Sequence, residues 1–468
     1  MLSVWSIVDQ DAAIVKKGQP TSWLEWALCE TAAHPHPETL ETFRRHLDPA
    51  WIDQALELTG TMTLRKRRLP AEQVVWLVLG MALMRDRPIQ EVVRKLELAL
   101  PNDADTPVAC SAIAQARQRV GAEPLRWLFE RTGSRWAHQS ARQHAWRDLA
   151  LYGVDGTCMR VADSEVNRAH FGGTEGPRGD SGYPLVRIVT LMALRSHLLA
   201  AADIGPYREG EHALASALWD SISPNSLTIM DRGFFSAAVL LGITGRGENR
   251  QWLLRIKSST KMRVLKSYGP RDKLVELTVS NSARRKDTSL PKVFVARAIS
   301  HRRPDSDGEQ WLLTSLIEPV LYPASEIVEL YHERWELELG YDEIKTHMLE
   351  REESIRSRTV SGVMQELWGI LLAFNLVRLE MTHIAEQARV PPSRISFLMA
   401  LRWIRDEWLW CAVASPGSIP AKLQRMREKV AQFVLPPRRS ERRYPRVVKI
   451  KMSKFKRKRA KTSPLATN

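Results

Sequence analysis

The sequence predicts a mixed α/β protein with a helical N-terminal region, and three patterns indicate it. Apolar residues before residue 145 recur at helical spacing. Between residues 149 and 242, short apolar runs give several strands, a helix, a further strand and a second helix. That order is expected of a mixed sheet with helices over it. Residues 251–313 alternate apolar and polar side chains in short pieces, which is typical of further β structure.

Residues 1–145 form the predicted helical N-terminal domain. Pro70 suits the start of a helix, and Val74, Leu77 and Met81 follow at helical spacing. A second helix is expected from about Pro88. We expect this domain to bind DNA, because its third predicted helix is basic and could belong to a helix-turn-helix variant.

The third predicted helix is basic and rich in glutamine. It follows Ser111, a suitable N-cap, and ends before Gly121. Its apolar residues fall on one side, which leaves Gln118 and Arg119 facing outward. A helix-turn-helix variant would place Arg119 against DNA. A plain helical bundle with a solvated face fits the same pattern equally well.

Two aspartates follow short buried strands in the α/β region, which we assign to residues 146–250. The run from Leu149 to Val154 ends in Asp155, and the run from Leu227 to Met230 ends in Asp231. Strand ends are where open α/β sheets place ligands and reactive groups. Each aspartate alone could also be a turn or cap residue.

The remainder of the chain divides into three segments. Residues 251–320 are the predicted β-rich insertion, with turn signals at Gly269 and Gly308. Residues 321–400 contain a predicted long helix, 324–350, and a very apolar one around 368–381. Residues 401–468 comprise a C-terminal helical region and a basic tail. The apolar runs are too short to span a membrane, and the N-terminus does not resemble a signal peptide, so we expect a cytoplasmic protein.

The net charge of +16 is concentrated in two segments. Residues 438–461 contain 13 basic residues and one acidic residue, and residues 250–309 contain 15 basic and six acidic residues. The rest of the chain is mildly acidic. This distribution predicts a polyanionic partner, although DNA, RNA and an anionic membrane surface would all fit the charge.

The predicted long helix carries a polar stripe formed by Tyr331, Arg334, Glu338 and Lys345. At 100° per residue these positions fall within about 60° of one another. Glu338 alone could be a simple i,i+4 partner of Arg334. If its carboxylate met the two aspartates, the three would form a hard-oxygen site suited to Mg²⁺. Two such ions can activate water and stabilise the leaving oxygen of a phosphodiester.

The segment from Tyr331 to Lys345 matches the pattern Y-x2-R-x3-E-x6-K. In this the chain resembles bacterial insertion-sequence transposases of the DDE class, and most closely the insertion-sequence-4 family. Asp155–Gly156 resembles the first aspartate of that family, and Asp231–Phe235 resembles the second. Other matching segments are Leu64–Pro70, Gln115–Arg119, Gln365–Gly369 and Tyr444–Lys449.

The resemblance implies a ribonuclease-H-like catalytic core in which Asp155, Asp231 and Glu338 bind two Mg²⁺ ions, with Mn²⁺ as a substitute. It also implies that Tyr331, Arg334 and Lys345 contact the DNA strand near the cleaved transposon end. In related enzymes a tryptophan of the insertion stacks on a flipped base. The candidates for that role are Trp311 and Trp335, although either ring could instead pack in the core.

The implied activity is that of a DNA transposase, which cuts at the terminal inverted repeats of its element and joins the ends to target DNA. Pairing two ends implies a homodimer, and the family implies a bacterial, nucleoid-associated protein. Two other functions remain open at this point. One is a non-catalytic DNA-binding regulator derived from a transposase, and the other is a related nuclease or resolvase.

Overall fold

The computed structural model describes residues 49–62, 69–95, 108–176, 179–180, 182–302, 308–350, 354–411 and 419–436. The described residues up to Val434 belong to one compact unit. The basic tail, the segment Tyr444–Lys449 and most of Leu64–Pro70 lie outside the described residues.

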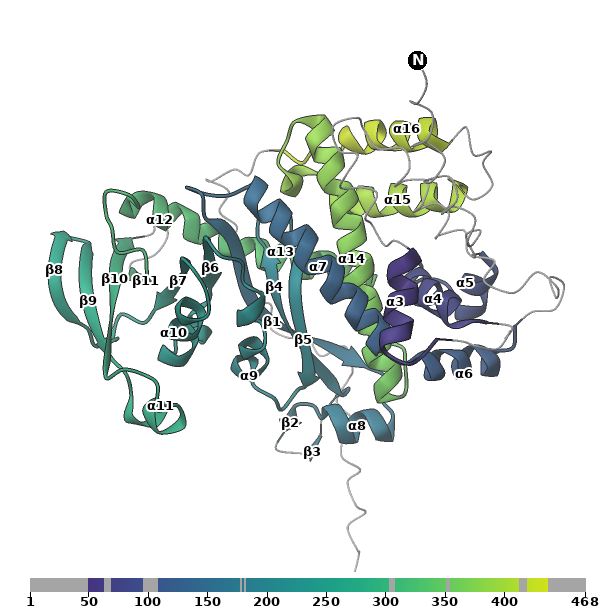
Figure 1. Cartoon of the computed structure of the whole chain (residues 1–468), viewed down its shortest axis with the longest axis horizontal. Helices are drawn as coiled ribbons and strands as arrows, with labels where there is room; N and C mark the ends of the chain where they lie inside the picture. The colour runs from purple at the N-terminus through teal and green to yellow at the C-terminus, as the bar shows by residue number, and fades with distance from the viewer. Residues whose placement is uncertain are drawn as a thin grey trace, which may run out of the picture. The chain divides into compact units, whose positions relative to one another are not determined.

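One mixed sheet of ten strands forms the centre of this unit (Figure 1). Its strand order is β5-β4-β1-β6-β7-β11-β10-β9-β8, and β12 pairs with β1. The strands are β1 (Ala150–Val161), β4 (Leu185–Ala193), β5 (Leu199–Pro206), β6 (Ser226–Met230), β7 (Arg250–Ile256), β8 (Arg263–Gly269), β9 (Asp272–Thr278), β10 (Val293–Arg302), β11 (Glu309–Thr314) and β12 (Ser354–Ile355). The short strands β2 (Glu175–Gly176) and β3 (Gly179–Asp180) pair with each other.

The strands of the predicted β-rich insertion continue the core sheet. Strand β7 pairs in parallel with β6 on one side and antiparallel with β11 on the other. The physical reason is that Trp252, Leu253 and Leu254 of β7 are all buried. A strand buried on both faces belongs inside a sheet, so the boundary expected at residue 250 falls within continuous β structure.

Helices pack on the sheet and on its β5 edge. Helix α7 (Glu123–Gln143) packs on β1, β4 and β5, α9 (Glu211–Ser216) packs on β4 and β5, and α10 (Ala237–Gly245) packs on β7. The helix expected between the strands of the α/β region is the short α9, which is followed by the 3-10 turn η2 (Trp219–Ser221). Because α7 lies against the sheet, the expected N-terminal domain of residues 1–145 shares its last helix with the α/β region.

The remaining helices begin with the N-terminal group α3 (Pro49–Leu58), α4 (Ala71–Leu83), α5 (Ile89–Lys95) and α6 (Cys110–Val120). Helix α6 begins at Cys110, and its N-cap is Ala109 rather than the expected Ser111. Its residues Ile113, Ala116 and Val120 are buried as predicted. The other helices are α8 (Glu165–Phe171), α11 (Asn281–Lys286), α12 (Ala324–Tyr331), α13 (Trp335–Asp342), α14 (Val360–Ala388), α15 (Phe397–Cys411) and α16 (Ile419–Ala431).

Helix α14 is the apolar core helix. It packs against α4, α7 and α16, and its Asn375 side chain bonds both the N–H and the C=O of Leu199, each at 2.9 Å. The Asn375 amide thus pairs with the N–H and C=O of one residue, Leu199, on the edge strand β5. By length and composition alone α14 could cross a membrane, but 78% of its apolar window is buried inside the protein.

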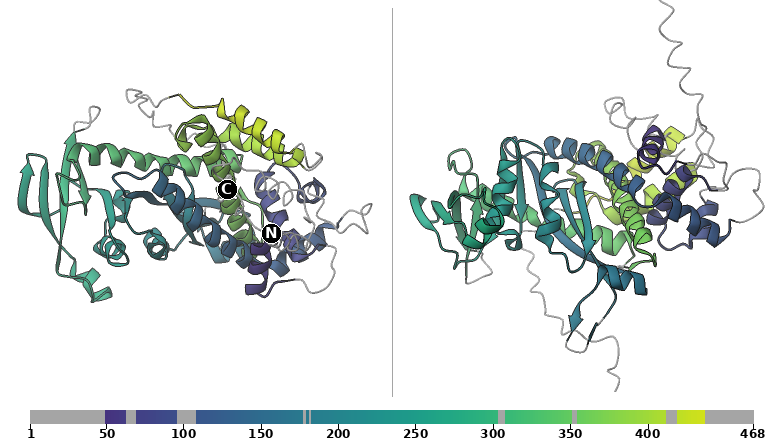
Figure 2. Two further views of the ribbon diagram at one scale, coloured as in Figure 1. Left: turned by 45° about the horizontal axis from the view of Figure 1, so that its top comes forward. Right: turned by 60° about the horizontal axis from the view of Figure 1, so that its bottom comes forward.

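The expected continuous helix over 324–350 is divided into four pieces. After α12 comes a 3-10 turn, η4 (His332–Arg334), then α13, and finally a π-helical turn, η5 (Glu343–Met348). Figure 2 shows these pieces as one extended helical run. We call residues 324–348 the catalytic helix below, after the role that the sequence predicts for Glu338. A π turn adds a residue to the helical repeat, and such turns occur frequently at functional sites.

Candidate active site

Asp155 and Asp231 lie next to each other at the end of two parallel strands. The pairing of β1 with β6 ends at Val154 opposite Met230, so each aspartate is the next residue along its chain. The sequence predicted that Asp155 follows its strand. In the structure Asp155 lies inside β1 instead. The reason is that β4 continues to pair with β1 as far as Arg160.

Burial makes Asp155 an unusual carboxyl group. Its pKa is raised to about 6, mainly by burial and also by the negative charges of Asp231 and Glu211, although the Gly156 N–H and the Arg334 guanidinium act to lower it. The Gly156 N–H donates to Asp155 Oδ1 at 2.8 Å. A carboxylate whose charged form is disfavoured by burial and by a neighbouring carboxylate is a suitable ligand for a cation, because the cation's charge would stabilise the ionised form.

The Asp231 side chain is held by the turn that follows it. It caps the 3-10 turn η3 (Arg232–Phe234), and its Oδ1 accepts the Gly233 N–H at 2.6 Å. His212 of α9 contacts the Gly233 carbonyl through Nε2 at 2.6 Å, and its ring stacks on Phe234 at 5.4 Å between centroids. The sequence around Asp231 therefore builds a fixed support for its carboxylate.

The catalytic helix lies over the face of β1 that carries Asp155. Side chains alternate along a strand, so Gly153, Asp155 and Thr157 share one face. A Cβ added at Gly153 would come within 2.7 Å of Leu337, which shows how closely α13 approaches. The Tyr341 hydroxyl donates to the carbonyl oxygen of Asp155 at 2.6 Å and ties the helix to this strand.

The polar stripe of the catalytic helix converges on the aspartates. Arg334 donates to Glu338 at 2.8 Å, and its charge also acts on Asp155. The Tyr331 hydroxyl has its pKa raised by burial and by the charge of Asp231, whereas Arg334 lowers it. Lys345, in the π turn, donates to the Thr157 hydroxyl at 3.4 Å.

The donor set suits a divalent cation, although the carboxylates do not yet surround one point. Among the described residues, no three His, Cys, Asp or Glu side chains are arranged to hold a metal ion. Glu338 is instead directed at Arg334. Carboxylate oxygens are the ligands that Mg²⁺ prefers, and a cation would relieve the repulsion that raises the pKa of Asp155.

The other predicted DNA-contacting residues lie at separate places. Trp335 begins α13, is 40% exposed and lies beside Arg334, whose Cζ is 5.4 Å from the ring centroid. Trp311 of β11 is half-buried, packs against the core and has the Lys273 ammonium 6.0 Å from its ring centroid. Arg119 is exposed on α6, outward as predicted.

The sequence did not reveal one further acidic residue near the site. Glu211 of α9 lies over Gly156, where an added Cβ would come within 2.7 Å of its side chain. Arg187 pairs with Glu211 at 2.5 Å. The glycine at position 156 could have indicated that another element approaches the backbone closely next to Asp155. The sequence alone could not identify Glu211 as the approaching residue, because that depends on tertiary packing.

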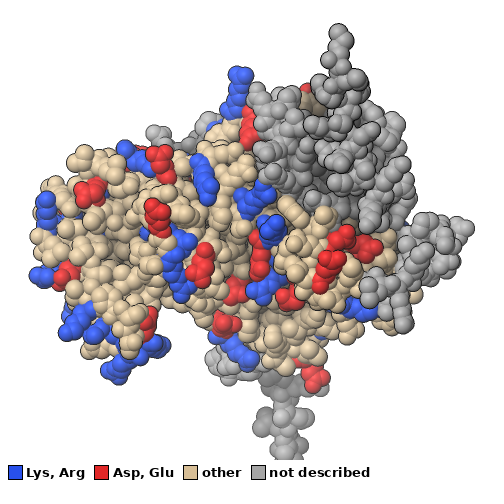
Figure 3. All heavy atoms as spheres, viewed as in Figure 1, with Lys and Arg blue, Asp and Glu red and all other residues tan. Residues whose placement is uncertain are grey.

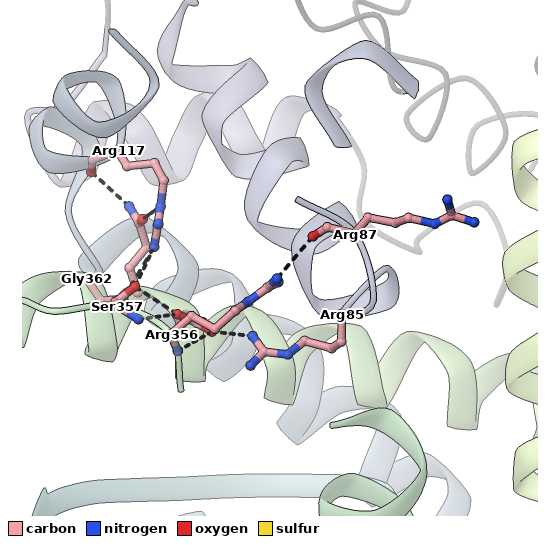
Figure 4. Close-up of polar contacts among 8 residues, drawn as sticks. Arg85, Arg87, Arg117, Arg356, Ser357 and Gly362 are labelled. Carbon is pink, nitrogen blue, oxygen red and sulfur yellow. Dashed lines mark hydrogen bonds and ion pairs between the residues drawn. The ribbon is translucent and has the colours of Figure 1, made fainter. Parts of the chain in front are cut away.

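A buried polar network joins two of the segments that matched the family pattern (Figure 4). Arg117 of α6 donates to Gln365 at 2.8 Å, and Gln365 donates back to the Arg117 and Gly121 carbonyls at 3.0 and 2.6 Å. Glu366, next in α14, forms an ion pair with Arg85 and accepts the Ser357 hydroxyl at 2.8 Å. These segments thus connect the N-terminal helices to α14.

Comparison with known proteins agrees with this arrangement. The family described as insertion element 4 transposase N-terminal matches residues 37–130, and the transposase DDE domain family matches residues 146–376. The transposase InsG for insertion sequence element IS4 of Escherichia coli (strain K12) is 38% identical over 411 residues, covering 88% of this chain and 92% of the relative.

A cryo-EM structure of the piggyBac transposase synaptic complex with hairpin DNA aligns over 89% of this chain and 86% of that chain. Its TM-score is 0.39 at 10% sequence identity, a likeness too weak to define a fold.

These family matches show that the chain is a DNA transposase of the DDE class, an enzyme whose family depends on divalent metal ions. Within that class the chain belongs to the IS4 family. The predicted family and transposase function are confirmed, and the comparisons give no support to a non-catalytic regulator or to a nuclease that does not join DNA ends.

Proposed function

We propose that this transposase moves its element by a cut-and-paste reaction at a triad formed by Asp155, Asp231 and Glu338, within a ribonuclease-H-like core. The observation that carries the proposal is the adjacency of the two aspartates at the end of paired parallel strands, beneath a helix whose polar stripe includes Glu338. Together with the family match, this arrangement supports the assignment of all three carboxylates.

The triad would hold Mg²⁺, with Mn²⁺ as a substitute, and two ions bound there would activate water and stabilise the leaving oxygen. The protein's own contribution is to gather the acceptors and to position DNA. Arg334 pairs with Glu338 at 2.8 Å. With the Glu338 carboxylate directed to a metal ion, the Arg334 guanidinium would be available to bind the phosphate beside the scissile bond.

The remaining stripe residues would hold the DNA strand around the cleaved end. Lys345 and Arg334 would contact phosphates, and Tyr331 would pack against the sugar-phosphate backbone near Asp231. Trp335 is the better candidate for stacking on a flipped base because it is exposed beside Arg334, whereas Trp311 is partly covered by the core.

The DNA partner would extend over the insertion. Figure 3 shows Lys and Arg side chains gathered on the side of the molecule formed by the insertion strands and α11. Exposed basic residues of the insertion include Lys257, Lys261, Arg263, Lys266, Arg271, Arg285, Lys286 and Lys292. We assign double-stranded terminal repeats and target DNA to this surface and to the basic tail, and additional repeat contacts to Arg119.

Synapsis of two ends would require a homodimer, and the reaction would take place in the bacterial cytoplasm at the nucleoid. In domain terms, residues 1–145 would bind the repeats, 146–250 and 321–400 would form the catalytic core around the 251–320 insertion, and 401–468 would add the C-terminal helical region and the basic tail.

The proposal is tested with the full-length chain and a supercoiled plasmid that carries both ends of the element encoding it. In Mg²⁺, the wild type should nick and join DNA, and Asp231→Ala and Glu338→Ala should each cleave at least about 100-fold more slowly, because several kcal/mol of metal-supplied stabilisation is lost.

Asp163→Asn provides the matched control, since this exposed carboxylate lies just beyond the other end of β1 and pairs with Arg168 at 2.6 Å. It should cleave like the wild type. Equal cleavage by the wild type and Glu338→Ala would show that the triad is assigned incorrectly. Supplying a pre-cut end separates joining from cutting, and a joined product is expected.

A further inference from the structure

The side of the catalytic helix opposite the polar stripe carries a second, buried charge cluster. Glu336, Gly340 and Glu343 fall within about 60° of one another, on the face about 180° from Glu338 and Lys345. Both carboxylates point to one ring. His197 Nε2 lies 2.9 Å from Glu336 Oε2, and Nδ1 lies 3.1 Å from Glu343 Oε2.

The His197 side chain is 3% exposed and comes from the tight turn between β4 and β5. Its backbone adopts φ of 59°, a conformation that is uncommon for a non-glycine residue and costs free energy. The preceding part of the same turn supplies Arg195, which pairs with Glu333 at 2.7 Å. Through Arg195 and His197, this short turn therefore contacts three carboxylates of the catalytic helix, which are Glu333, Glu336 and Glu343.

The hydrogen bonding of this cluster suits a doubly protonated ring. Each ring nitrogen of His197 faces a carboxylate oxygen, and the imidazolium form has one ring N–H donor for each of these two acceptors. On its other side, Glu343 lies 3.6 Å from the Nε of Arg378, whose side chain is completely buried in α14. With His197 as an imidazolium, this largely buried cluster would contain two carboxylates and two cationic groups.

The position of Glu343 connects this cluster to the reaction. Glu343 is the first residue of the π turn η5, and Lys345 lies two residues further on in the same turn. The extra residue of a π turn rotates every side chain that follows it, so the contact that holds Glu343 also sets the direction of Lys345. Glu336 is likewise two residues from Glu338, on the opposite face.

We propose that His197 is a positioning residue which, as an imidazolium, clamps Glu336 and Glu343 and so fixes the rotation of the catalytic helix over Asp155. This inference rests on the proposed triad, because it is through Glu338 and Lys345 that the clamp acts on DNA cleavage. The clamp itself touches neither metal nor DNA.

The direct test uses His197→Asn in the full-length chain. Asparagine tolerates a positive φ, so the turn is retained while the two-donor ring is removed. Binding of a duplex carrying one element end should stay within about twofold of the wild type, because the DNA-contacting residues remain. Cleavage by the bound protein should fall about 100-fold, as expected when reacting groups shift by about 1 Å.

His197→Gly provides a rescue experiment. Glycine also accepts the positive φ and leaves a space the size of the missing ring. Imidazole added to this variant should restore most of the lost cleavage rate. Glu326→Gln is the matched control, because this exposed carboxylate of the same helical run pairs with Arg147 at 2.6 Å and lies outside the clamp. It should cleave like the wild type.

A spectroscopic measurement tests the clamp independently of cleavage. In protein labelled with ¹⁵N-histidine at pH 7.5, the signals that disappear in His197→Asn should have both ring nitrogens protonated. The proposal is overturned if one of them is unprotonated, if His197→Asn cleaves at the wild-type rate, or if binding and cleavage decline together. Inactivity of Asp231→Ala alongside an unaffected His197→Asn would reject the clamp and leave the triad standing.

Discussion

At the scale of single residues, the site depends on carboxylates that are kept close together at an energetic cost. Burial and the charge of Asp231 raise the pKa of Asp155 to about 6, and Arg334 opposes that shift. Burial disfavours the charged form of Arg334, but its hydrogen bond to Glu338 and the charges of Tyr331, Glu338 and Asp155 outweigh this and raise its pKa. The Arg334 guanidinium therefore acts as an internal counter-ion for these carboxylates.

A first prediction concerns that arginine. Arg334→Gln should reduce cleavage by about 100-fold or more, since removing one preorganised donor for developing charge costs that much in other enzymes. Arg334→Lys should recover only part of the rate, because an ammonium cannot form the bidentate contact of a guanidinium. Cleavage rates on the plasmid substrate measure both effects. Arg126→Gln, which removes an exposed i,i+4 pair with Glu130, is the control.

A second prediction concerns pH and stability. Burial lowers the pKa of His138 and of His383 to about 4, so both are neutral in the folded protein. Between pH 6.5 and 4 these two histidines are protonated in the unfolded chain but remain neutral in the folded protein. Stability should therefore fall between pH 6.5 and 4, by at most about 3 kcal/mol for each histidine.

Urea unfolding at pH 7.5 and 5.0 measures this pH dependence. The double variant His138→Gln, His383→Gln should lose less stability over that interval than the wild type. An identical loss in both proteins would show that other groups control the acid transition. His138 contributes a specific contact as well, because its Nδ1 lies 2.7 Å from the Tyr152 hydroxyl of β1.

The residues that could be predicted from the sequence are those with a local signature. Asp231 follows an apolar strand, and Glu338 shares a helical stripe with Arg334, so both could be found by spacing. His197 and Glu211 could not be found in this way. Their roles depend on a turn and a helix that approach the site from elsewhere in the sheet, and no periodicity in the sequence records that approach.

At the scale of elements, the strands and helices were predictable as units but not in their extent. Strand β1 continues past Asp155 because its antiparallel partner β4 extends to Arg160, and pairing between strands is not a local property. The catalytic helix is interrupted at η4 and η5, although its sequence contains no proline between residues 324 and 348 and its glycine, Gly340, lies inside α13. Tertiary contacts account for these interruptions better than local propensity does.

A third prediction concerns the connection between α14 and the N-terminal helices. Glu366 is completely buried, and although burial opposes its charged form, the nearby Arg85 and Arg117 and the Ser357 hydroxyl bring its pKa below the usual value. Glu366→Ala should lower the free energy of unfolding by about 3–5 kcal/mol, because it leaves a buried arginine without its counter-ion.

Equilibrium urea unfolding gives that difference. Glu130→Ala removes a carboxylate from the exposed pair with Arg126 and should change stability by no more than about 0.5 kcal/mol. A similarly small effect at Glu366 would mean that the α14 connection contributes little to the folded state.

At the scale of the whole molecule, the strongly basic segments and the carboxylates of the proposed site lie in different parts of the chain. The excess of basic residues lies in the insertion and in the tail, whereas the three carboxylates of the proposed triad belong to the mildly acidic remainder. The shared sheet places the basic strands and the acidic site on one continuous framework, since β7 pairs with both β6 and β11. The sequence indicated the charge separation but could not indicate this continuity.

A fourth prediction follows from the basic surface. Helix α11 has no buried residue, and its Arg285 and Lys286 are exposed. If both contact phosphates, the double variant Arg285→Ala, Lys286→Ala should reduce the slope of log affinity against log salt by about 1.8. Filter binding across a range of salt concentrations measures the slope. An unchanged slope would show that α11 does not contact DNA.

The central claim, that Asp155, Asp231 and Glu338 together hold the catalytic metal, is tested most directly by Mn²⁺ titration of the full-length chain, followed by electron paramagnetic resonance. The wild type should bind Mn²⁺, and Asp155→Asn, Asp231→Asn and Glu338→Gln should each weaken binding by at least about tenfold, as the loss of a ligand requires. Wild-type affinity in all three variants would contradict the account.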